Sequence, residues 1–120
     1  MRTFIRTSVI LAVAALLGGA APAPDRTAVE LNGMLDHGYY RTHTLTLRSG
    51  MEYTFVGACD RDCSDLDLQL FDENGNLIDE DLLGDDVPVV AVVPDWTGRF
   101  YVKVIMASCS VSPCGYTIVA

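Results

Sequence analysis

The sequence has few cationic residues. Eight lysine and arginine residues stand against sixteen aspartate and glutamate residues among 120 positions. Two of the eight, Arg2 and Arg6, lie in a segment that we expect to be removed, which leaves six cationic residues and a net charge of −10. Nucleic acid and anionic lipid are bound by cationic surfaces, so this balance argues against both partners. It suits a soluble exported domain, a metal cation or a basic partner.

The sequence also lacks a hydrophobic run long enough to span a bilayer. Its most apolar stretch, residues 9–17, follows Arg2 and Arg6 and precedes the small residues 18–20. This is the pattern of a cleaved secretory signal peptide. We expect cleavage after Ala20, secretion or release into the periplasm, and no membrane insertion afterwards. No cysteine lies near the cut, so we do not expect a lipid anchor.

Residues 1–20 are therefore interpreted as a signal peptide. Residues 21–30, which begin with Ala-Pro-Ala-Pro, are expected to form a flexible tail. Residues 31–120 are expected to form one domain, because about 100 residues are the size of a typical domain and we find no internal repeat or linker.

No segment of the domain shows a convincing helical pattern. Apolar and polar residues alternate instead, as they do in strands that cover a core on one side. The apolar positions of five such segments are His43, Leu45 and Leu47; Met51, Tyr53 and Phe55; Leu66, Leu68 and Leu70; Phe100, Val102 and Val104; and Tyr116 and Ile118. An Asn-Gly pair at Asn74 and Gly75 predicts a tight hairpin. The sequence therefore predicts an antiparallel β-sandwich of about seven or eight short strands.

Four cysteines in a short exported domain indicate two disulfides, which three pairings could form. We expect the local pairs Cys59–Cys63 and Cys109–Cys114, each closing one loop. A four-cysteine zinc site is the rival interpretation, although structural zinc often uses tighter C-x2-C spacing. A redox site is not expected, because neither pair is C-x-x-C.

Four segments in order resemble the bacterial pre-peptidase C-terminal domain family, from about Leu31 to Val119. They are LNGMLDHGYYRTHTLTLRSGMEYTF, SDLDLQLFDENGN, VPDWTGRFYVKV and GYTIV. The resemblance implies a jelly-roll-like sandwich without catalytic activity. Members of the family are usually appended to secreted proteases and other hydrolases, and related collagen-binding domains use calcium at one end. This sequence departs from the pattern by carrying no enzyme and by its two cysteine pairs.

The stretch CDRDCSDLDLQLFDENGN concentrates carboxylates. Calcium prefers six to eight oxygen ligands, so Asp60, Asp62, Asp65 and Asp67 form a candidate calcium site, and calcium is the one cofactor that the residues indicate. Solvated carboxylates with local turn hydrogen bonds are the alternative. A second acidic group could share a cation with the first only if the fold joins them. Its members are Asp79, Glu80, Asp81, Asp85 and Asp86.

Asp72, Asn74 and Asn76 imitate the first ligands of a helix-loop-helix calcium loop. That loop requires glycine where Leu77 stands and glutamate where Leu83 stands, so we interpret the segment as a hairpin turn.

The sequence lacks a nucleophile elbow, G-x-S-x-G, and it contains only two histidines, His37 and His43. We therefore do not expect an enzyme, and we expect His43 to cap the core through a hydrogen bond. Trp96 and Tyr101 are candidate recognition residues, although a turn tryptophan more often covers one end of a core.

These observations predict a non-catalytic exported module that binds an extracellular or envelope protein or a polysaccharide, with calcium ordering an acidic loop. The alternative is a structural or stability module of the cell envelope that has no specific ligand. A small hydrolase is the third hypothesis.

Overall fold

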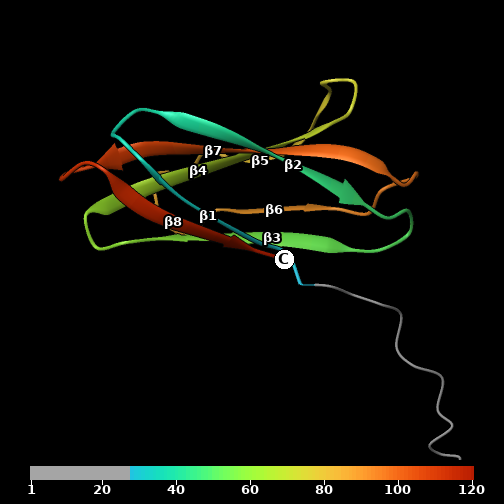
Figure 1. Cartoon of the computed structure of the whole chain (residues 1–120), viewed down its shortest axis with the longest axis horizontal. Coiled ribbons are helices and arrows are strands. Elements are labelled where there is room, and N and C mark those ends of the chain that lie inside the picture. The colour runs from blue at the N-terminus through green and yellow to red at the C-terminus, as the bar shows by residue number, and fades with distance from the viewer. Residues whose placement is uncertain (1–27) are drawn as a thin grey trace, which may run out of the picture.

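The computed structural model describes residues 28–120, so the expected signal peptide and most of the expected tail lie outside the described residues. Two four-stranded antiparallel sheets pack face to face (Figure 1). Sheet I contains, in spatial order, β1 (Glu30–Leu35), β8 (Cys114–Val119), β3 (Tyr53–Cys59) and β6 (Val89–Val92). Sheet II contains β2 (Tyr40–Leu47), β7 (Gly98–Cys109), β4 (Cys63–Asp72) and β5 (Leu77–Asp81). This order is that of a jelly roll, and the predicted all-β sandwich is confirmed.

The core lies between the two sheets, and it follows the alternation of the sequence. Leu66, Leu68 and Leu70 on β4 and Val102 and Val104 on β7 are fully buried. Burying a side chain of this size contributes about 1.5–3 kcal/mol, so these two neighbouring strands of sheet II contribute strongly to the stability of the fold. Polar neighbours such as those at alternate positions of β2 remain exposed, as a half-buried antiparallel strand requires.

Both disulfides are confirmed as the predicted local pairs. Cys59 ends β3 in sheet I and Cys63 begins β4 in sheet II, whereas Cys109 ends β7 in sheet II and Cys114 begins β8 in sheet I. Each bond therefore closes a short loop and also joins the two sheets. Because Cys63 and Cys109 are register partners, both bonds lie at the same end of the sandwich.

The predicted hairpin between β4 and β5 is also confirmed. The Oδ1 atom of Asp72 accepts hydrogen bonds from the backbone N–H groups of Asn74 and Asn76, both at 2.9 Å. Gly75 has a φ of 84°, a conformation that favours glycine. These hydrogen bonds lower the pKa of Asp72, because they stabilise its ionised form. The carboxylate of Asp72 therefore holds the turn together.

Carboxylates of β5 cover the free edge of β6. The Oδ2 atom of Asp79 accepts a hydrogen bond from the N–H group of Ala91, and that of Asp81 accepts one from Val89, both at 2.9 Å. Part of the second acidic group thus links sheet II to sheet I along one side of the sandwich. The outward amides of β6 are consequently unavailable to another strand.

Removing both disulfides by replacing all four cysteines with serine should lower the free energy of unfolding by about 4 kcal/mol. Each bond closes a short loop, and the chain-entropy model assigns about 2 kcal/mol to a loop of this length. Urea denaturation of the oxidised protein and the serine variant measures the difference. A loss well below 1 kcal/mol would contradict a stabilising role for the two bonds between the sheets.

Candidate functional site

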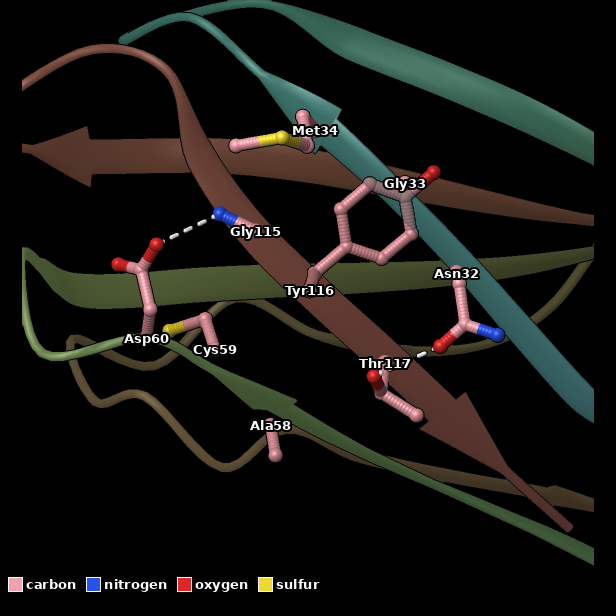
Figure 2. Close-up of a pocket in the computed structure, with 9 residues that line it drawn as sticks. All are labelled: Asn32, Gly33, Met34, Ala58, Cys59, Asp60, Gly115, Tyr116 and Thr117. Atoms are coloured by element: carbon pink, nitrogen blue, oxygen red, sulfur yellow. Dashed lines mark hydrogen bonds between the residues drawn. The ribbon is translucent and has the colours of Figure 1, made fainter.

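The four aspartates of the predicted calcium site divide into two pairs. Asp60 and Asp62 lie in the loop between β3 and β4, whereas Asp65 and Asp67 lie on β4. The Oδ1 atom of Asp60 accepts a hydrogen bond from the N–H group of Asp62 at 3.1 Å, and its Oδ2 atom accepts one from Gly115 at 2.8 Å (Figure 2). Asp60 thus connects its loop to β8 through hydrogen bonds. This is the alternative to a calcium ligand that the sequence left open for Asp60, a carboxylate that accepts hydrogen bonds in a turn.

Asp65 and Asp67 alternate along β4 with the core leucines and so face away from the core. Even so, the Oδ1 atoms of both are buried and have no hydrogen-bond partner among the described residues. Asp67 is only 9% exposed. A carboxylate oxygen buried in this way has lost its water without gaining a donor, which is costly.

Two members of the second acidic group lie near this pair. Asp81 ends β5, and Asp85 lies in the loop between β5 and β6. This loop contacts β4 directly, because the backbone oxygen of Asp85 accepts a hydrogen bond from the N–H group of Leu66 at 3.0 Å. We call Asp65, Asp67, Asp81 and Asp85 the carboxylate cluster. The sequence did not show whether the two acidic groups would meet.

The cluster raises the pKa of Asp67 to about 6. Burial is the largest cause, since it disfavours the ionised form. The negative charge of Asp65 acts in the same direction, followed by the charges of Asp81 and Asp85. Asp67 therefore takes up a proton at a higher pH than an ordinary aspartate does.

The other two carboxylates already have backbone partners. The Oδ1 atom of Asp81 accepts a hydrogen bond from Leu83 at 3.1 Å, in addition to the bond from Val89 to its Oδ2 atom. The Oδ1 atom of Asp85 accepts one from Val87 at 3.0 Å. Consistently, no three histidine, cysteine, aspartate or glutamate side chains in residues 28–120 are arranged to hold a metal ion. A cation at the cluster would rely on Asp65 and Asp67, with water and the charge of their neighbours.

The histidines make hydrogen bonds within the fold. The Nε2 atom of His43 lies 2.7 Å from the hydroxyl oxygen of Tyr116, so the hydrogen bond expected for His43 is present. Burial and the nearby charge of Arg41 lower the pKa of His43. The Nδ1 atom of His37 accepts a hydrogen bond from the N–H group of Cys109 at 3.1 Å, next to the second disulfide.

The two candidate recognition residues do not share a face. Trp96 stacks on Phe100, with ring centroids 5.7 Å apart and an interplanar angle of 24°. The ring of Phe100 is buried, so Trp96 covers one end of the core while remaining 38% exposed. Tyr101 follows Phe100 on β7 and faces the opposite side of sheet II. Tyr40 reaches that same outer face, where the Lys103 ammonium lies 4.1 Å from its ring centroid.

A hollow of about 510 Å³ lies over β1, β8 and β3 (Figure 2). The polar groups at its rim are already paired: Thr117 donates a hydrogen bond to the Oδ1 atom of Asn32 at 2.8 Å, and Asp60 accepts one from Gly115. The sequence did not reveal this hollow, because small residues on three separate strands form it only after pairing. Its lining residues are Asn32, Gly33, Met34, Ala58, Cys59, Asp60, Gly115, Tyr116 and Thr117.

Comparison of the sequence with protein-family models and with curated proteins gave no match. The resemblance to pre-peptidase C-terminal domains therefore depends on the order of the four segments alone. Within residues 28–120, no helix is long and apolar enough to cross a membrane.

Asp67 should stabilise the protein more at pH 5 than at pH 7.5 in the presence of EDTA, against an opposite contribution from His43, whose pKa is lowered. Asp67 has a pKa of about 6 in the folded chain and an ordinary value near 4 in the unfolded chain, so the folded state binds more protons between these values. The free energy of unfolding then falls as the pH rises through 6. We expect Asp67 to contribute about 1.4 kcal/mol more at pH 5 than at pH 7.5, measured by urea denaturation as the difference between the wild type and the Asp67→Asn variant.

The Asp67→Asn variant should lose most of this pH dependence. Asp95→Asn is the matched control, because it removes the same charge from an exposed turn away from the cluster. Parallel pH profiles for the wild type and the Asp67 variant would contradict the assignment.

Proposed function

We propose that this chain is a non-catalytic, exported binding module that acts as an accessory domain at a protein or polysaccharide surface, with calcium organising its carboxylate cluster. The observation that carries the proposal is the pair of buried, unpartnered Oδ1 atoms of Asp65 and Asp67. They lie where β4 meets the end of β5 and the loop that follows it.

A cation would relieve two unfavourable terms at this point. Buried carboxylate oxygens without donors lose hydration, and neighbouring negative charges repel one another. Calcium is bound by carboxylates together with carbonyl oxygens and water, and two free carboxylates correspond to a weak site. We expect a dissociation constant of about 10⁻⁴–10⁻³ M, the range of extracellular calcium modules.

The disulfides support the exported location. All four cysteines are paired, and such bonds persist in oxidising compartments such as the periplasm or the extracellular medium. The signal-like N-terminus and the resemblance to domains appended to secreted hydrolases support the same location and the accessory role.

One observation favours the alternative, a structural module of the envelope that has no specific ligand. The raised pKa of Asp67 allows its carboxyl group to become neutral by taking up a proton, while Asp81 and Asp85 are held by backbone amides. The thermal stability of such a protein would not depend on calcium.

Thermal unfolding in EDTA and in calcium at about ten times the dissociation constant separates the two functions. Ligand at this concentration adds about 1.4 kcal/mol, which should raise the midpoint by about 6–10 °C in a domain of this size. Replacing Asp65 and Asp67 with asparagine should abolish the shift.

The Asp60→Asn/Asp62→Asn variant is the matched control, because it removes the same charge from the same acidic stretch. Its midpoint should fall, since Asp60 holds the loop, yet the calcium-induced shift should remain. An unchanged midpoint of the wild type in calcium would favour the structural module.

A further inference from the structure

The loop between β5 and β6 exposes a group of aliphatic side chains. Leu82, Leu83 and Val87 are 49%, 68% and 52% exposed, and Val89 at the start of β6 is 43% exposed. Isolated exposed apolar residues are ordinary, whereas four of them within eight consecutive positions concentrate exposed apolar groups in one loop. We call residues 82–89 the apolar loop.

Hydrogen bonds hold the apolar loop in place. Asp81 accepts bonds from the N–H groups of Leu83 and Val89, which lie at its two ends. Asp85 accepts one from Val87 through its side chain and one from Leu66 on β4 through its backbone oxygen. The leucines are therefore presented on a fixed backbone. A partner would bind without having to order this loop, which favours affinity.

The surroundings of the loop are strongly acidic. Residues 62–98 contain eleven aspartate and glutamate residues and no lysine, arginine or histidine. This stretch comprises β4, β5, β6 and their loops, so the negative charge gathers on one side of the sandwich. A cationic partner would be attracted to this side and an anionic one repelled.

The way in which a partner can bind is also restricted. The N–H groups of Val89 and Ala91 on β6 already donate to the carboxylates of Asp81 and Asp79. An added strand could not use these amides, so β-augmentation at this edge is blocked. Docking must proceed through side chains, which is how an amphipathic helix binds an apolar surface.

We propose that the apolar loop docks a basic amphipathic helix of a partner protein. Leucine-like side chains of the helix pack on Leu82, Leu83 and Val87, and its lysines or arginines face the surrounding carboxylates. This inference rests on the proposed function in that the chain is a binding module, and it selects a protein rather than a polysaccharide as the partner. It does not require calcium.

A synthetic 14-residue peptide with leucines on one helical face and lysines on the other tests the proposal. It is titrated against the domain by isothermal calorimetry, beside a peptide of the same composition whose scrambled order forms no apolar face. The ordered peptide should bind about ten times more tightly than the scrambled one. Raising the salt concentration should weaken both, since screening reduces the attraction of charges.

The variant Leu82→Ser/Leu83→Ser should bind the ordered peptide about ten times more weakly, because it removes two aliphatic contacts without changing the charge. Met34→Ser/Val111→Ser is the matched control, since these side chains are 56% and 63% exposed elsewhere on the domain. The control should bind as the wild type does. Both variants should unfold at nearly the wild-type temperature, because the residues replaced are exposed.

Equal affinity for the ordered and scrambled peptides would mean that charge alone attracts them, and would overturn the proposal. An unchanged affinity of the Leu82/Leu83 variant would overturn it too, because the peptide would then bind elsewhere. A calcium-dependent thermal shift without peptide binding would overturn only the docking surface and leave the proposed calcium site standing. Peptide binding without a thermal shift would support the docking surface and leave the calcium site unsupported.

Discussion

The packing of the two sheets through one apolar face each is the interaction on which the rest of the structure depends. It buries the leucines of β4 and the valines of β7 and leaves the alternate side chains of the same strands to face outward. Asp65 and Asp67 face outward for this reason, since they alternate with Leu66 and Leu68. The disulfides between the sheets strengthen the same packing at one end of the sandwich.

The carboxylates of this domain act mainly as hydrogen-bond acceptors for its own backbone. Asp60 and Asp72 hold loops, and Asp79 and Asp81 cover the edge of β6. A high acidic content is thus compatible with a stable fold, because many of the charges accept hydrogen bonds from amides that would otherwise lack a partner. Asp67 differs from these groups, since burial and its neighbours oppose its ionisation.

This difference gives the acidic side two distinct properties. Asp67 can take up a proton because its pKa is raised, and the carboxylate cluster can, as we propose, bind calcium. The apolar loop next to it presents aliphatic groups that the core does not use. Both depend on the same loop, which Asp81 anchors at its two ends and Asp85 joins to β4. The resemblance to accessory domains of secreted hydrolases agrees with a function in binding.

Local patterns made much of the fold predictable. Alternation at Leu66, Leu68 and Leu70 depends on the two-residue period of a strand, and the Asn74-Gly75 turn depends on the backbone freedom of glycine. The close spacing of the cysteines allowed their pairing to be inferred, because short loops bring such residues within bonding distance. The sequence by itself thus determined the strands, the hairpin and the disulfides.

Only the tertiary structure decided which carboxylates form a site. The sequence placed Asp60, Asp62, Asp65 and Asp67 in one group, and the fold assigns the first of them to a loop hydrogen-bond network. Strand pairing and the return of the chain from sheet II to sheet I bring Asp81 and Asp85, which are distant in the sequence, close enough to Asp67 to raise its pKa. The physical reason is that burial, charge proximity and hydrogen-bond satisfaction are properties of neighbours in space, which a linear pattern does not specify.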